Sequence, residues 1–216
     1  MAVKILIADD HAVVREGLRT ILEVPGDFEI VGEAGDGKDA VYKAELLEPD
    51  VILMDISMPE LNGIDATRTI RERLPAARVI ILSMHHSNEY VLRAMQAGAR
   101  AYILKESAGC NAVYAVRAVM RGRLYFGDGV ESPQMKNYLI PAPPQSPLDR
   151  LSRRERETLQ LVVEGNTNVA IAELFKVSTK SVETYRSRLM LKLNISNVPA
   201  LVIFAIQHGV ISIPGL

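Results

Sequence analysis

The sequence predicts an α/β protein with a doubly wound, five-stranded parallel sheet, followed by a small all-α domain of four helices. Five short apolar runs alternate with segments of helical periodicity over about the first 122 residues. These runs are almost continuous in apolar residues, as expected for strands that helices cover on both faces. Beyond a proline-rich stretch, the periodicity predicts helices alone, which indicates a second domain of another class.

The elements of the first domain are expected to alternate along the chain. Strands are predicted near residues 3–8, 28–34, 50–54, 78–83 and 100–104, and helices near 12–23, 37–47, 63–73, 88–97 and 108–121. Turn residues support these bounds, because Pro25 and Gly26 follow the first helix and Gly98 ends the fourth. Right-handed crossovers between the strands then give a doubly wound sheet.

Chemically specific residues follow three of the apolar runs. The first run ends in Asp9 and Asp10. The third ends in Asp55, and the fifth ends in Lys105. Function in open α/β sheets lies beyond the carboxyl ends of the strands, so these groups are expected to meet at one edge. Carboxylate oxygens are the ligands that Mg²⁺ prefers, and a divalent cation activates an aspartate toward a phosphoryl group. The set predicts a phosphoryl-accepting site.

A less specific interpretation exists for each ending taken alone. An acid pair after a strand is more often a solvated turn or a helix cap, and a single lysine there is usually a surface charge. The order of acid pair, acid and lysine after three separate runs favours the site over these alternatives.

Residues 1 to about 122 resemble the receiver domain of bacterial two-component response regulators, which has a flavodoxin-like fold. The resemblance implies that a sensor histidine kinase phosphorylates Asp55, and that Asp9, Asp10 and Asp55 bind Mg²⁺. It also implies that the backbone carbonyl of Ser57 is a metal ligand. Residues 58–63 match the loop that follows the phosphoacceptor in this family.

Three further residues match positions that respond to phosphorylation in the family. Lys105 corresponds to the invariant lysine, Ser83 to the switch hydroxyl and Tyr102 to the switch aromatic residue. A hydroxyl near a new aspartyl phosphate can donate a hydrogen bond to it, and its movement leaves space for an aromatic ring to turn. Taken alone, Tyr102 is more often an ordinary half-buried aromatic residue of a strand.

The second part of the chain begins with a linker. Five of the eleven prolines fall between positions 133 and 147, so we predict a receiver domain over 1–122, a linker over 123–147 and a helical domain over 148–216. Ser152 and Glu155 form a capping-box pattern that opens a helix to about residue 164. Three more helices are expected near residues 167–175, 178–193 and 197–208. The second and third make a helix-turn-helix candidate.

The third of these helices has a polar face opposite its apolar face. Val182, Leu189 and Leu193 are expected to face the core. The polar stripe, which would enter the major groove of DNA, consists of Lys180, Glu183, Thr184, Ser187 and Arg188. The alternative is a solvated helix face, and periodicity alone favours it.

Residues 148 to about 213 resemble the four-helix DNA-binding domain of the LuxR and NarL group of transcription regulators, also called the NarL/FixJ family. The resemblance rests mainly on residues 151–157, 171–172, 177–178, 181–182 and 192–193. It implies that the polar stripe binds double-stranded promoter DNA, and Lys192 is added to the expected DNA contacts. The last helix pairs with its copy in this family, so Leu201, Val202 and Phe204 are expected at a homodimer interface, at least when the protein is phosphorylated. The alternative is that this helix only completes the core.

Charge and composition agree with this division. Residues 1–147 hold 16 Lys and Arg against 20 Asp and Glu, and residues 148–216 hold 9 against 6. The second part therefore has a net charge of +3 and is the candidate for phosphate binding. No long apolar span or secretory leader is expected, which predicts a cytoplasmic protein without a membrane partner. Cys110, the only cysteine, is expected to pack as a small apolar residue in the fifth helix.

These observations predict a DNA-binding response regulator and not an enzyme. A phosphatase that uses Asp55 as its nucleophile is the competing enzyme hypothesis, but such enzymes usually carry an acid two residues further, where this chain has Ser57. A third possibility is a phosphorylation-controlled protein-binding module that has lost contact with DNA. A salt-dependent mobility shift on promoter DNA separates that module from the regulator.

Overall fold

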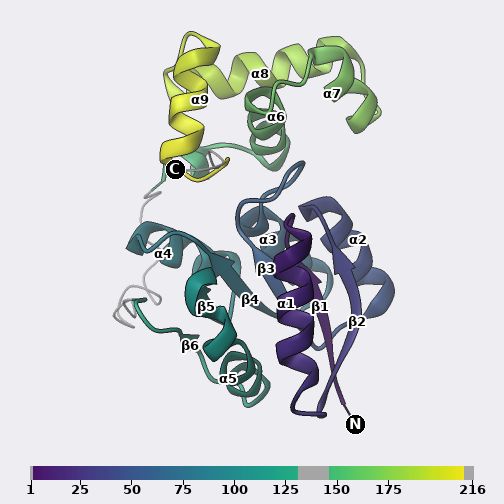
Figure 1. Ribbon diagram of the computed structural model, residues 1–216. Coiled ribbons are helices and arrows are strands. Elements are labelled where there is room, and N and C mark those ends of the chain that lie inside the picture. The colour runs from purple at the N-terminus through teal and green to yellow at the C-terminus, as the bar shows by residue number, and fades with distance from the viewer. Residues whose placement is uncertain (1, 131–145, 212–216) are drawn as a thin grey trace. The chain divides into compact units, whose positions relative to one another are not determined.

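The computed structural model describes residues 2–130 and 146–211. Contacts divide the chain into two units, Met1–Leu139 and Ile140–Leu216, which we call the sheet unit and the helical unit (Figure 1). Of the predicted linker, residues 131–145 lie outside the described residues.

A parallel sheet forms the centre of the sheet unit. Its strands lie in the order β2-β1-β3-β4-β5-β6, and all neighbouring strands are parallel. The strands are β1 (Val3–Ala8), β2 (Phe28–Ala34), β3 (Val51–Asp55), β4 (Arg78–Ser83), β5 (Ala101–Leu104) and β6 (Tyr125–Phe126). The doubly wound parallel topology is therefore confirmed, and the strand order reverses between β1 and β3.

The prediction of five strands is wrong by one, because β6 adds a short sixth strand at the edge next to β5. Its two residues lie where the sequence predicts the start of the linker. The amide of Tyr125 donates to the carbonyl of Arg100 at 3.1 Å, and the Tyr125 hydroxyl lies 2.5 Å from Asn111 Oδ1. The strand thus depends on partners from β5 and α5 that no local sequence pattern reveals.

Helices cover both faces of the sheet (Figure 1). One face carries α1 (Ala12–Glu23) and α5 (Ala108–Met120). The other carries α2 (Gly37–Leu47), α3 (Gly63–Arg73) and α4 (Asn88–Ala97). Successive residues of a strand point to opposite faces, so the strands that are buried on both faces are apolar along most of their length. This explains the continuous apolar runs in the sequence.

The prediction for Cys110 is wrong, since this residue is exposed. The buried face of α5 is formed by Ala108, Asn111, Ala112, Ala115, Val116 and Val119. Position 110 falls outside this spacing of three and four residues, on the face of the helix that points away from the sheet.

Four helices and a preceding short 3₁₀ segment build the helical unit. The elements are η3 (Pro147–Arg150), α6 (Arg153–Val163), α7 (Asn168–Phe175), α8 (Thr179–Leu193) and α9 (Val198–Gln207). The capping box at the start of α6 is confirmed, because Ser152 Oγ accepts from the Glu155 amide and Glu155 Oε2 accepts from the Ser152 amide. Val182 and Leu189 are fully buried in the core and Leu193 packs against it, as predicted.

Helix length and hydropathy bear on membrane insertion. Within residues 2–130 and 146–211, no single helix is both long and apolar enough to cross a bilayer. Helices α8 and α9 meet that test only together, across a bend of 65°, and both contribute residues to the core of the helical unit.

Gly63, at the start of α3, allows the loop after β3 to fold back against the end of that strand. A Cβ atom at position 63 would lie 1.9 Å from the carbonyl oxygen of Asp55, and this neighbour is backbone. We expect Gly63→Ala to destabilise the protein by about 3 kcal/mol through overpacking. Urea unfolding of the full chain, followed by circular dichroism, measures the change.

The control for this substitution is Gly17→Ala in α1, where a Cβ atom would have no neighbour within 4 Å. It should stabilise the protein by up to about 1 kcal/mol, because alanine has the higher helix propensity. Equal midpoints for the two variants would show that the close approach at Gly63 is not required.

Candidate functional site

The carboxyl edge of the sheet brings the predicted acids and lysine together. Asp9 follows β1, Asp55 is the last residue of β3 and Lys105 follows β5. Lys105 Nζ lies 2.8 Å from Asp9 Oδ2 and 2.9 Å from Asp55 Oδ2. The side chains of Asp9, Asp55 and Lys105 are 0%, 3% and 12% exposed. The site lies where the strand order reverses, the usual position of a functional crevice in such sheets.

Burial and the neighbouring charges shift the protonation equilibria of this site. Burial raises the pKa of Asp55 to about 6, and the negative charge of Asp9 acts in the same direction. The positive charge of Lys105 and a hydrogen bond from the Ser57 backbone oppose the shift. Burial lowers the pKa of Lys105, but the charges of Asp55 and Asp9 outweigh it and raise the pKa overall. The site therefore holds two buried acids around one ammonium group.

The same edge can hold a divalent cation. Carboxylate oxygens of Asp9, Asp10 and Asp55 and a ring nitrogen of His11 all lie within 4.8 Å of one another. Asp10 is exposed, whereas Asp9 and Asp55 are buried. This gives the cation an open side on which waters can remain bound, as Mg²⁺ requires. The donor set is compatible with Mg²⁺.

His11 is a member of this cluster that the sequence analysis missed. Its Nδ1 atom lies 2.6 Å from Asp10 Oδ1 and 3.3 Å from Asp9 Oδ1. The sequence feature that could have indicated its membership is its position directly after the acid pair. The role of the Ser57 carbonyl as a metal ligand remains a prediction, because the contact shown for Ser57 is the one from its backbone to Asp55.

The two predicted switch residues lie next to each other on β4 and β5. Ser83 and Tyr102 are buried, and Ser83 Oγ accepts from the His85 amide at 2.9 Å. The Tyr102 hydroxyl donates to the His85 carbonyl at 2.8 Å. Burial raises the pKa of Tyr102 above its usual value, and a hydrogen bond with Ser83 opposes this. Both residues thus hold the segment between β4 and α4 through the backbone of His85.

The predicted polar stripe lies on the exposed face of α8. All five of its residues are exposed, while Val182 and Leu189 between them are buried. The turn that precedes α8 is well defined, because Lys176 adopts a left-handed conformation with φ of 55° and Ser178 caps α8 by accepting from the Ser181 amide. The helix therefore presents its polar face to solvent in a fixed direction relative to α7.

Lys192, the sixth predicted DNA contact, forms an ion pair within the helical unit. Its Nζ atom lies 2.6 Å from Glu155 Oε2. Burial raises the pKa of Glu155, but hydrogen bonds from Lys192 and Ser152 outweigh burial and lower the pKa overall. This ion pair joins the end of α8 to the start of α6. Contact between Lys192 and DNA remains a prediction.

The predicted dimerisation residues on α9 have different environments. Leu201 is 0% exposed and belongs to the core of the helical unit, so its assignment to an interface is corrected. A side chain with no exposed surface in its own unit has none to offer to a second copy. Val202 and Phe204 are partly exposed. Ile203 is 58% exposed and is the apolar residue that the prediction of this surface omitted.

Two family models match the chain. The model of the response regulator receiver domain matches residues 5–117. The model of bacterial regulatory proteins of the luxR family matches residues 149–205. The chain belongs to the response regulators with a LuxR-type DNA-binding domain.

Two similar proteins align with almost the full length of this response regulator. Transcriptional regulatory protein MctR from Rhizobium johnstonii is 37% identical over 97% of this chain and 96% of its own. Response regulator UvrY from Escherichia coli is 36% identical over 96% of this chain and 95% of its own. Both alignments therefore span the two segments of this chain that the family models match.

Solved structures agree with the fold. Salmonella typhimurium RcsB response regulator has a TM-score of 0.64 with 27% identity, covering 96% of this chain and 98% of that chain. A structure of two RcsB dimers bound to two parallel DNAs has a TM-score of 0.57 with 26% identity, covering 94% and 98%. The response regulator described here is thus a DNA-binding transcription regulator of a two-component system.

The raised pKa of Asp55 predicts a pH dependence of the site. Without a divalent cation, the Asp55 carboxyl should titrate near pH 6, so its charged form is lost as the pH falls through that value. Mg²⁺ should move the midpoint to lower pH, because the cation favours the carboxylate. Carbon-13 NMR of aspartate side chains measures the midpoint, and Asp55→Asn assigns the resonance.

A second variant tests the cause of this pKa. Lys105→Met removes the positive charge that lowers the pKa of Asp55 and should move its midpoint above that of the unmodified chain. A cation-free midpoint near that of a free aspartate would contradict the assigned burial.

Proposed function

We propose that a sensor histidine kinase phosphorylates Asp55 in a Mg²⁺-dependent reaction, and that the phosphoryl group switches dimerisation and DNA binding to control transcription. The observation that supports this most strongly is the buried Asp55 carboxylate, which lies 2.9 Å from Lys105 and close to Asp9 and Asp10. We place this process in the cytoplasm, where phosphoryl donors and chromosomal DNA are both accessible. Asp55 would accept the phosphoryl group as a regulatory modification, without steady turnover of a substrate.

The transfer is a nucleophilic displacement at phosphorus. A carboxylate oxygen of Asp55 forms the new oxygen–phosphorus bond, while the bond from phosphorus to the donor nitrogen breaks and its electron pair leaves with the histidine of the kinase. Lys105 can contact the transferred group as a point charge. A bound Mg²⁺ would neutralise the negative oxygens of both partners. Asp9, Asp10 and Asp55 would hold it, with the Ser57 carbonyl as a further ligand.

The phosphorylated state is proposed to move Ser83 and Tyr102. Ser83 is buried at the end of β4, next to the strand that carries Asp55. A new phosphoryl group would accept a hydrogen bond from its hydroxyl, which would take Ser83 away from the His85 amide. Tyr102, which is already buried, could then release the His85 carbonyl and take another hydrogen-bond partner. This exchange of partners would carry the signal to the segment before α4.

The exposed stripe on α8 is proposed to bind the major groove of promoter DNA. Its members offer two cations, a carboxylate and two hydroxyls, which suit contacts to phosphates and base edges. The net charge of +3 on residues 148–216 is modest, so one copy should bind weakly. We propose that a homodimer supplies two half-sites, with Val202 and Phe204 at its interface and with Ile203 added from the structure.

Phosphorylation of Asp55 is tested with acetyl phosphate and Mg²⁺. The protein should gain an acid-stable, base-labile phosphate, and Asp55→Asn should abolish the label because the substitution removes the proposed nucleophile. Mass spectrometry of the intact chain detects the added group. Asp27→Asn, which removes an exposed acid before β2, is the control and should be labelled normally. Labelling that survives in Asp55→Asn would remove Asp55 from its proposed role.

DNA binding is tested with the double variant Lys180→Ala and Arg188→Ala. It should weaken binding to promoter DNA and reduce the slope of log affinity against log salt by about 2 per protomer, since two phosphate contacts are lost. Mobility shifts at several salt concentrations give the slope. The control pair is Arg121→Ala with Arg123→Ala, which removes the same charge from exposed positions of the sheet unit. An unchanged slope in the first variant would place the stripe away from DNA.

A further inference from the structure

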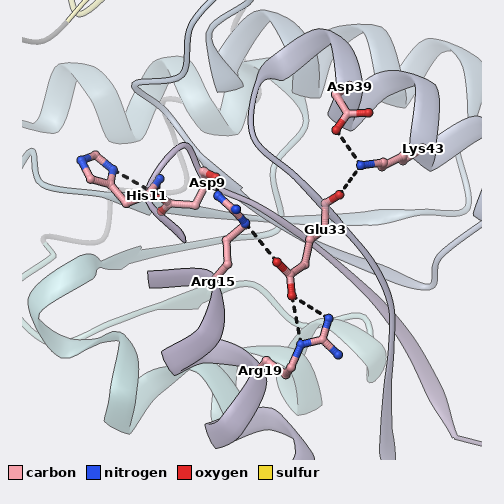
Figure 2. Close-up of polar contacts among 7 residues, drawn as sticks. All are labelled: Asp9, His11, Arg15, Arg19, Glu33, Asp39 and Lys43. Atoms are coloured by element: carbon pink, nitrogen blue, oxygen red, sulfur yellow. Dashed lines mark hydrogen bonds and ion pairs between the residues drawn. The ribbon is translucent and has the colours of Figure 1, made fainter. Parts of the chain in front are cut away.

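A cluster of charged residues next to the site is not explained by the chemistry above. Figure 2 shows Glu33 of β2 between two arginines of α1 and a lysine of α2. Arg19 donates to Glu33 Oε1 from Nε at 2.9 Å and from Nη2 at 2.6 Å, and Arg15 Nε donates to Oε2 at 3.0 Å. Lys43 Nζ donates to the Glu33 carbonyl at 2.5 Å. We call Arg15, Arg19, Glu33 and Lys43 the Glu33 cluster.

The carboxylate of Glu33 is fixed in orientation by this cluster. Each of its two oxygens accepts from a different arginine, and its own backbone is held by Lys43. The hydrogen bond from Arg19 lowers the pKa of Glu33, and burial opposes this only in part. Glu33 therefore stays ionised at neutral pH. Since a carboxylate held on both oxygens cannot rotate, it fixes the plane of the Arg15 guanidinium in turn.

Arg15 links the Glu33 cluster to the acid pair. Its Nη1 atom donates to the carbonyl oxygen of Asp9 at 2.7 Å. The β1 ladder ends at Ala8, opposite Met54 on β3 and Ala34 on β2, so the Asp9 carbonyl lies beyond the last strand partner. Arg15 takes the place of that partner. The Asp9 amide donates to the Ala34 carbonyl at 3.1 Å, which anchors the residue to β2 from its other side.

The peptide group that Arg15 contacts is the one that joins Asp9 to Asp10. Its orientation sets where the chain leaves the strand, and therefore where the exposed Asp10 carboxylate lies relative to the buried Asp9 and Asp55. A cation site requires these oxygens at matched distances, and loss of a group that orients a metal ligand weakens metal binding. We propose that Arg15, oriented by Glu33, is a positioning residue that fixes this peptide and thereby sets the divalent-cation affinity of the phosphoryl-accepting site.

This inference rests on the proposed function. It predicts that removal of Arg15 lowers the Mg²⁺ affinity, whereas simple electrostatics predicts that it raises it. Arg15 carries a positive charge close to the acids, so its removal alone would favour binding of a cation. Loss of a group that orients the ligands typically weakens metal binding by about 10-fold to 100-fold. The direction of the change in Mg²⁺ affinity therefore separates a positioning role from a charge effect.

The test compares Arg15→Gln with Arg19→Gln in the full chain. Both variants lose one positive charge of α1 and a contact to Glu33, but only the first loses the contact to the Asp9 carbonyl. Isothermal titration with Mg²⁺ alone should show a dissociation constant at least about tenfold higher for Arg15→Gln. Arg19→Gln keeps both contacts of Arg15, to Glu33 Oε2 and to the Asp9 carbonyl, so it should weaken binding far less than Arg15→Gln. Unchanged or tighter binding in Arg15→Gln, or equal weakening in both variants, would overturn the proposal.

Phosphorylation kinetics give a second readout that a merely structural role would not move. For Arg15→Gln, the Mg²⁺ concentration for half-maximal labelling by acetyl phosphate should rise by the same factor as the dissociation constant. The maximal rate at saturating Mg²⁺ should approach that of the unmodified chain. A lower maximal rate with unchanged half-saturation would contradict the proposal.

A second variant tests the same role without replacing Arg15, in case Arg15→Gln does not fold. Glu33→Gln keeps both arginines but loosens the guanidinium of Arg15, and it should weaken Mg²⁺ binding several-fold. Circular dichroism establishes that each variant is folded at the temperature of the titration. Failure of the proposed function would appear separately, as an unmodified chain that gains no phosphate at Asp55 whatever its Mg²⁺ affinity.

Discussion

The ion pairs of Lys105 with Asp9 and Asp55 are the interaction on which the rest of the sheet unit depends. Two buried carboxylates repel each other and lose hydration, so they require a positive charge within contact distance. Lys105 Nζ lies 2.8 Å from Asp9 Oδ2 and 2.9 Å from Asp55 Oδ2. This requires β1, β3 and β5 to end at a common edge. The loop after β3 also folds back against the carbonyl of Asp55, so closely that only glycine fits at position 63.

Most of the fold could be predicted because local pattern and tertiary structure agree. Continuous apolar runs identify strands covered on both faces, and the bounds of the five long strands and of the helices lie close to those predicted. The convergence of Asp9, Asp55 and Lys105 followed from parallel topology alone, since every strand of such a sheet delivers its last residue to the same edge. Capping patterns located the start of α6 for the same reason, because Ser152 and Glu155 act locally.

What could not be predicted depends on contacts between distant segments. The two residues of β6 pair with β5 without any pattern of their own. Cys110 is exposed and Leu201 is buried because the orientation of a helix face is decided by its neighbours, which composition does not describe. The place of His11 in the acidic cluster depends on the turn after β1. In the helical unit, the pairing of Lys192 with Glu155 joins residues far apart in sequence.

The contact between Tyr102 and His85 constrains these two positions to different degrees. The tyrosine hydroxyl binds the main-chain carbonyl at position 85, an atom that every amino acid supplies. A substitution at position 85 therefore leaves this hydrogen bond intact. It would remove only the stacking of the His85 ring on Tyr90. Tyr102 is more constrained. Phenylalanine at position 102 would fill the same space but would have no hydroxyl to donate to the His85 carbonyl.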